Sequence, residues 1–140
     1  MTKSLISLLA AGGTVLLAVG CSTHYKGPYL PQTPNTPAYE GREPFILLDP
    51  GVQYAVTCSG IQKQSLPDGR LEVVAHLRNR ENRRIEVQAN CVFKDQNSFS
   101  TGDETPFVTV ILTENGTEDV KFVSVNNLAK KCTIRVRQAR

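Results

Sequence analysis

Cysteine and histidine are the residue types that most readily do chemistry in this 140-residue chain, and it holds only four Cys and two His. There is no Cys-x-x-Cys and no paired histidine spacing, so a zinc site is not expected. His76 has no sequence neighbour that would activate a nucleophile. Ser59 precedes Gly60 without the Gly-x-Ser-x-Gly pattern of a nucleophile elbow. We therefore predict a non-enzyme with no catalytic residue, metal, cofactor or small-molecule substrate.

The first cysteine, Cys21, follows a segment typical of a secretory signal. Residues 1–20 have a short charged start at Lys3 and then a mostly apolar run. That run is short for a membrane-spanning helix, which needs roughly 20 apolar residues. Leu17-Ala18-Val19-Gly20-Cys21 resembles the bacterial lipobox, in which the cysteine thiol is diacylated and the chain is cut before it. The alternative is an ordinary secretion signal with an incidental cysteine.

Lipid on Cys21 would attach the protein to a membrane. Each buried methylene contributes about 0.8 kcal/mol, so several acyl chains, palmitate among them, would hold the protein there almost permanently. Ser22 follows the cysteine, in place of the Asp that retains many lipoproteins in the inner membrane. By that resemblance we expect a bacterial cell-envelope protein, on the outer membrane and facing the periplasm.

Residues 21–50 are expected to form the lipid anchor and a Pro-rich tether. Proline fixes φ and favours an extended conformation in the residue before it, so this segment is predicted to be semi-extended. It is interpreted as a spacer, or else as a ligand for an aromatic groove. Its end, Phe45-Ile46-Leu47-Leu48, could be a first edge strand. Six of the eight prolines lie here: Pro28, Pro31, Pro34, Pro37, Pro44 and Pro50.

Residues 51–140 are predicted to form one all-β domain. Apolar and polar residues alternate along 71–78, 85–94 and 132–137, which is typical of strands with one buried face. Turn sequences separate the runs, among them Leu66-Pro67-Asp68-Gly69 and Asn115-Gly116. This spacing predicts an immunoglobulin-like β-sandwich of about seven short antiparallel strands.

The domain contains the short motifs Leu77-Arg78-Asn79, Val87-Gln88-Ala89-Asn90-Cys91-Val92-Phe93-Lys94-Asp95, Pro106-Phe107, Phe122-Val123-Ser124-Val125-Asn126 and Cys132-Thr133-Ile134-Arg135-Val136-Arg137. These motifs resemble a known family, the YcfL type of small bacterial lipoproteins of the periplasm and outer membrane. They span roughly residues 52–138. Two departures are Phe93 and Phe107, where the family tends to have Trp or Tyr, and Cys132, where it often has an aromatic residue. The resemblance implies an immunoglobulin-like fold and an envelope location, and it brings no established catalytic residues.

With Cys21 lipidated, Cys58, Cys91 and Cys132 remain, and the cell envelope allows a disulfide. Cys91 and Cys132 are in phase with the inward-facing residues of their strands. A bridge between them would close a loop of about 40 residues, worth roughly 3–4 kcal/mol in the chain-entropy model. The alternative is three buried free thiols that pack as small apolar groups.

Two basic clusters stand out against a net charge of only +3. Such clusters suit anionic headgroups, an anionic polymer or an acidic protein. The alternative is the solvated outer face of ordinary strands. Nucleic acid is disfavoured, because no aromatic platform is interleaved with these charges. The candidate basic surface comprises Arg78, Arg80, Arg83, Arg84, Lys131, Arg135 and Arg137.

These features together predict a membrane-anchored envelope lipoprotein with a non-catalytic β-sandwich. Its expected partners are the membrane, through the N-terminal lipid, and an envelope protein or anionic polymer, through the basic surface. The alternative is a structural or accessory subunit of an envelope assembly, without a ligand of its own.

Overall fold

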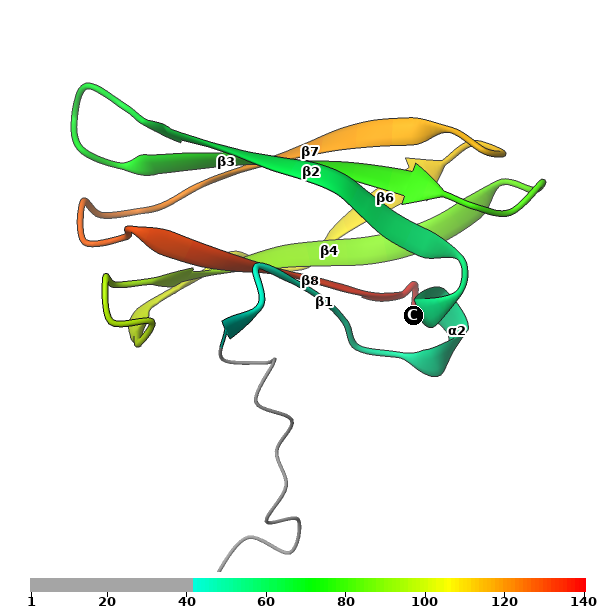
Figure 1. Cartoon of the computed structure of the whole chain (residues 1–140), viewed down its shortest axis with the longest axis horizontal. Helices are drawn as coiled ribbons and strands as arrows, with labels where there is room; N and C mark the ends of the chain where they lie inside the picture. The colour runs from blue at the N-terminus through cyan, green and yellow to red at the C-terminus, as the bar shows by residue number, and fades with distance from the viewer. Residues whose placement is uncertain (1–41) are drawn as a thin grey trace, which may run out of the picture. The chain divides into compact units, whose positions relative to one another are not determined.

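The computed structural model describes residues 42–140, and these form two β-sheets packed against each other (Figure 1). We name each sheet by its central strand. The β4 sheet has the order β1-β8-β4-β5, with β6 also paired to β4, and the β3 sheet has the order β2-β3-β7. The predicted all-β sandwich is thereby confirmed. The elements are β1 (Phe45–Leu47), α2 (Pro50–Gln53), β2 (Val56–Ser65), β3 (Leu71–Asn79), β4 (Ile85–Lys94), β5 (Ser100–Glu104), β6 (Val108–Leu112), β7 (Thr117–Val123) and β8 (Lys131–Gln138).

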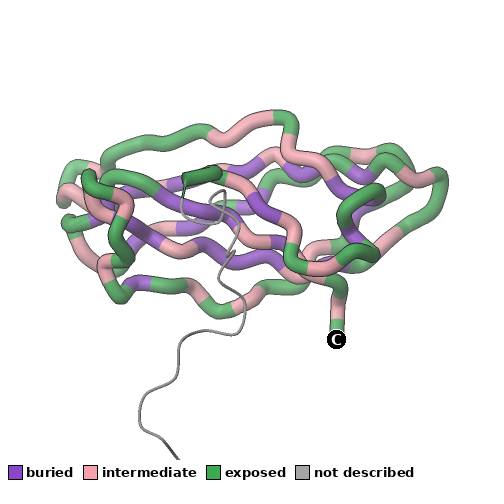
Figure 2. Tube along the Cα trace, turned by 60° about the horizontal axis from the view of Figure 1, so that its bottom comes forward, coloured by how far each residue is buried: buried purple, intermediate pink, exposed green. Residues whose placement is uncertain are grey.

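The alternation in the sequence corresponds to the two faces of each sheet. In β3 every second side chain from Leu71 to Leu77 is buried, and in β8 the buried set includes Ile134 and Val136. Figure 2 shows buried residues along the strands and exposed residues in the connecting turns. Successive side chains of a strand point to opposite faces of its sheet. The residues that alternate with these buried side chains therefore lie on the outer faces of the sandwich.

The β4 strand organises its sheet because it has partners on both edges. Antiparallel β8 pairs along one edge, while β5 and β6 share the other. Thr105 still joins the ladder, since its N–H donates to the Cys91 carbonyl at 2.9 Å. Pro106 follows and has no N–H to donate. The proline therefore stands where one strand ends and the next begins.

Residues 42–140 contain eight strands, close to the predicted seven, and differ from the prediction in having one parallel pair. Phe45 of β1 lies opposite Ile134 of β8, so the folded unit includes part of the segment assigned to the tether. The sequence allowed an edge strand there. Its pairing with β8, at the far end of the chain, could not be predicted from the local alternation of apolar and polar residues. The helical turn α2 was not predicted, because four residues are too few to show a 3.6-residue stripe.

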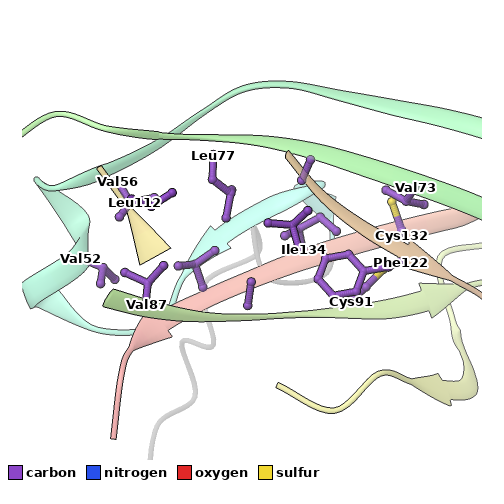
Figure 3. Close-up of a cluster of buried hydrophobic side chains, with 14 of the residues drawn as sticks. Val52, Val56, Val73, Leu77, Val87, Cys91, Leu112, Phe122, Cys132 and Ile134 are labelled. Carbon is purple, nitrogen blue, oxygen red and sulfur yellow. The ribbon is translucent and has the colours of Figure 1, made fainter. Parts of the chain in front are cut away.

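Side chains from both sheets form a single hydrophobic core (Figure 3). Phe93, Leu77 and Leu112 are the largest fully buried side chains, and the chain has no Trp. Val52 of α2 joins the same core and is 3% exposed. Among the described residues, no helix is long and apolar enough to cross a membrane.

Candidate functional site

Cys21 lies outside the described residues, as do the rest of the predicted signal and the tether up to residue 41. Its lipidation therefore remains a prediction.

Cys91 and Cys132, the predicted disulfide partners, lie on neighbouring strands and belong to the buried core (Figure 3). Cys91 is paired with Ile134 and Cys132 with Phe93, so the two cysteines are diagonal neighbours on one sheet face. Both are free thiols in this structure, and a hydrogen bond joins their side chains. The fold thus brings the two together, and the bridge itself remains a prediction.

The thiols differ in how readily they ionise. The hydrogen bond to Cys132, followed by burial, raises the pKa of Cys91 far above its usual range. The same hydrogen bond lowers the pKa of Cys132, helped by the charges of Lys63 and Lys94. Burial raises the pKa of Cys58, the third and half-buried thiol. Both thiols of the pair are buried in the core, so neither is exposed to an external reactant.

His76 has a partner that the sequence did not reveal. Its Nδ1 contacts Asp119 Oδ1 across the β3–β7 pair, on the outer face of the β3 sheet. The Ser59 hydroxyl donates to the backbone carbonyl of His76 at 3.3 Å, and not to the ring. Within residues 42–140, no hydroxyl or thiol is hydrogen-bonded to this imidazole. The arrangement therefore lacks the nucleophile-to-base contact of a hydrolase.

Three of the predicted basic residues, Arg80, Arg83 and Arg84, lie exposed in the β3–β4 loop. Arg83 is ion-paired with Glu81. A groove of about 220 Å³ is lined by this loop and α2 and reaches Gln138. These arginines gather at one end of the sandwich, as the sequence indicated.

Arg135 belongs to a hydrogen-bonded network on the outer face of the β4 sheet. Its Nε donates to Asn90 Oδ1 at 3.0 Å, and its Nη2 contacts Glu104. Asn90 in turn donates to Glu104 Oε1 at 2.8 Å and is fully buried. The carboxylate of Glu104 thus neutralises much of the charge of Arg135.

Arg137, two residues further along β8, is held differently. Its guanidinium carbon lies 3.7 Å from the ring centroid of Phe107, and its Nε donates to Gln88 Oε1 at 2.9 Å. Among the described residues, no carboxylate forms an ion pair with Arg137, and neither of its terminal nitrogens donates a hydrogen bond to any of them. Its cationic edge is therefore oriented by neutral neighbours and open to a ligand. We call this set, with the Arg135 network, the Arg137 face: Gln88, Asn90, Glu104, Phe107, Arg135 and Arg137.

A groove of about 200 Å³ adjoins the Arg137 face. Its lining combines three aliphatic residues, one threonine and two cationic residues, and comes from β4, β8, and β1 with the residue that follows it. The face and the groove together form one continuous outer surface of the β4 sheet. The lining residues are Ile46, Leu48, Val92, Lys94, Thr133 and Arg135.

The other two predicted basic residues lie elsewhere. Arg78 is exposed on β3, in the opposite sheet. Lys131 begins β8 and donates from Nζ to Ser98 Oγ at 3.0 Å, next to the β4–β5 loop. The seven residues therefore do not form one patch, because their strands belong to different sheets and their loops to different ends.

Sequence reasoning singled out the cations but missed the neutral residues that hold them. Gln88 and Asn90 alternate with the apolar core residues of β4, so the same period-two pattern places them on the outer face. That they meet Arg137 and Arg135 depends on the β4–β8 register, in which Gln88 pairs with Arg137. The register joins segments almost fifty residues apart and is not encoded in either strand alone.

Comparisons with known proteins support the fold. No family model matches the chain, and no curated protein matches it. The chain is similar to the crystal structure of Campylobacter jejuni cj0090, with 14% identity and a TM-score of 0.54, over 69% of this chain and 98% of that one. It is also similar to a DUF1425 family member from Shewanella sp. pv-4, with 22% identity and a TM-score of 0.55, over 61% of this chain and 79% of that one. At these identities the likeness shows a shared small β-sandwich fold.

Proposed function

We propose that this protein is a membrane-anchored lipoprotein of the bacterial cell envelope, of the YcfL type. The lipobox-like sequence around Cys21 and the Pro-rich segment after it support the anchor and the tether. The fold shared with a DUF1425 family member from Shewanella is compatible with the family resemblance. Ser22 favours the outer membrane, with the sandwich facing the periplasm.

The proposed activity is non-catalytic binding of an envelope protein or an anionic envelope polymer. The observation that carries it is the open guanidinium edge of Arg137, stacked on Phe107 and held by Gln88. An arginine fixed in this way loses little freedom when it binds a carboxylate or phosphate, and its planar fork suits both. We therefore place the binding site on the Arg137 face.

In-cell cross-linking followed by pull-down tests this proposal. Arg137→Gln removes the open charge, and we expect the reproducibly enriched partner to bind about 10- to 100-fold more weakly, because a charged hydrogen bond contributes about 1.5–3 kcal/mol. Arg80→Gln is the matched control, since it removes one exposed arginine from the β3–β4 loop. An unchanged thermal unfolding curve shows that both variants remain folded. Equal enrichment with the two variants, or no partner above background, contradicts binding at this face.

The alternative is a structural or accessory subunit of an envelope assembly, without independent ligand binding. The engagement of Arg135 with Asn90 and Glu104 favours it, because these groups satisfy one another within the chain. In that case Arg137→Gln leaves both partner enrichment and envelope phenotype unchanged.

A further inference from the structure

The β4–β5 loop and the β7–β8 connection lie at the end of the sandwich away from α2 (Figure 1), and both carry exposed apolar side chains. Phe99, in the β4–β5 loop, is 70% exposed, and Val125 and Leu128, in the β7–β8 connection, are 80% and 60% exposed. The two loops are neighbours because Lys94 is paired with both Ser100 of β5 and Lys131 of β8.

Internal hydrogen bonds hold the β4–β5 loop in place. The Asp95 carboxylate accepts from the backbone N–H of Asn97 at 2.8 Å and from that of Phe99 at 3.0 Å. Asp95 also donates its own N–H to the Phe99 carbonyl at 2.8 Å. Phe99 is therefore presented by a closed turn.

The β7–β8 connection is fixed in the same way. The buried carboxylate of Asp103 accepts from the Val125 N–H at 2.6 Å. Asn126 Oδ1 accepts from the Leu128 N–H at 2.9 Å. Both exposed aliphatic side chains thus stand on backbone that is already ordered, so binding through them costs little further ordering.

Two exposed lysines lie beside these side chains. Lys130 and Lys131 are exposed, and the Nζ of Lys131 is held by a neutral hydroxyl, Ser98 Oγ. The carboxylates of Asp95 and Asp103 lie in or beside the same loops and accept backbone hydrogen bonds, while Asp68, in the neighbouring β2–β3 turn, is ion-paired with Arg70. This end therefore combines projecting apolar groups with a rim of lysine.

We propose that this loop end docks on the surface of an anionic lipid bilayer. Apolar side chains that project from fixed loops can enter the boundary between headgroups and acyl chains, while lysines at their base meet the anionic headgroups. Phe99, Val125 and Leu128 project singly from two loops. A lipid layer can accept such separate side chains because it is soft and has no fixed pockets that they must match. The docking is independent of the proposed lipid anchor and of the Arg137 face.

Tryptophan fluorescence tests the docking, because the full chain contains no Trp. Phe99→Trp places the single reporter at the proposed contact, and Tyr54→Trp, at an 81% exposed position just after α2, is the matched control. The probe is a vesicle of phosphatidylglycerol and phosphatidylcholine with brominated acyl chains. We expect Trp at 99 to shift to the blue and to be quenched by bromines roughly 5–10 Å below the headgroup boundary. Trp at 54 should remain solvent-exposed and unquenched.

The second part of the experiment tests whether docking depends on the charge of the lipid headgroups and of the lysines. Vesicles of phosphatidylcholine alone should give little quenching of the reporter at 99. Lys130→Gln in the reporter chain should weaken the docking equilibrium about fivefold, since each lysine near an anionic surface contributes about 1 kcal/mol. Equal emission from the two reporters on anionic vesicles overturns the proposal, and so does docking that is insensitive to headgroup charge. A protein partner at this end would also give that negative result, because the vesicles contain none.

The anchor is tested separately by the mass of the N-terminal peptide, which shows whether Cys21 is acylated. A chain without acyl groups that still docks through Phe99 disproves the anchor and retains this inference. An acylated chain whose reporter at 99 stays solvent-exposed supports the anchor and disproves the docking.

Discussion

At the scale of the residue, Asn79 ends β3 and its side chain holds the β3–β4 loop in place. The side chain is fully buried. Its Nδ2 donates to the Arg83 carbonyl at 2.7 Å and to the Thr113 carbonyl at 2.9 Å, while its Oδ1 accepts from the Glu81 N–H at 2.9 Å. The amide therefore joins the β3–β4 loop, with its three arginines, to the end of β6. This explains the Leu77-Arg78-Asn79 motif as structural.

Asn79→Ala should lower the free energy of unfolding by about 1–3 kcal/mol, because it leaves buried backbone groups without partners. Urea denaturation followed by circular dichroism measures the change. Asn82→Ala, at an exposed position in the same loop, serves as the control and should change stability by no more than about 0.5 kcal/mol. Equal effects of the two substitutions would contradict the structural role of Asn79.

The two core thiols give a second prediction at this scale. Protein recovered from an oxidising compartment should contain a Cys91–Cys132 bridge, detected as the loss of two hydrogens in the intact mass. Reduction should cost roughly 3–4 kcal/mol of stability in the chain-entropy model. Cys132→Ala should abolish the mass change and Cys58→Ala should not. A full mass in the wild-type protein, with all its thiols titratable after unfolding, would favour the alternative of free core thiols.

At the scale of the element, β1 decides where the folded unit begins. Its backbone pairs with β8, and the Leu48 N–H extends the contact by donating to the Val136 carbonyl at 2.8 Å. Ile46 is only 8% exposed although it lies at the sheet edge. The described domain thus begins at about residue 45, several residues before the start that turn and proline spacing suggested.

Two deletions separate the tether from the strand. Removal of residues 22–40 should leave the thermal unfolding midpoint unchanged, because no residue of the described sheets is lost. Removal of residues 22–48 should cost about 2 kcal/mol or more, since burial of the Ile46 side chain alone contributes on that order. A melt monitored by circular dichroism compares the two. Equal stability of the two shortened chains would show that β1 contributes little to the fold.

At the scale of the whole molecule, the proposals assign different tasks to different surfaces. The N-terminal cysteine attaches the chain to the membrane, the loop end of the sandwich contacts lipid, and the Arg137 face remains available to a partner. A Pro-rich tether of some 25 residues spans at most roughly 75–80 Å when extended at about 3.1 Å per residue. That reach allows the sandwich either to lie on the bilayer or to stand away from it.

Cys21→Ser tests the anchor. The substitution removes the acyl acceptor, so palmitate labelling should disappear and the precursor should remain uncut at this site. Mass spectrometry of the N-terminal peptide and membrane fractionation measure the two effects. Cys58→Ser is the matched control and should retain the label. Palmitate incorporation that survives Cys21→Ser would contradict the proposed lipid site.

Sequence by itself determined the all-β class and the inward phase of the main strands, because alternation with period two is a local property that needs no partner. It also placed the 66–69 turn correctly, where Gly69 adopts a positive φ of 85° that glycine tolerates at no steric cost. The phase of Cys91 and Cys132 followed from the same pattern.

Only the tertiary structure decided what the outward-facing residues meet. The pairing of Gln88 with Arg137, the contact of His76 with Asp119 and the parallel addition of β1 to β8 all depend on strand order and register. Those are set by the packing of the complete core, which joins segments distant in the chain. The seven predicted cations were therefore divided among separate surfaces, and one of them, Arg137, was left with an open cationic edge.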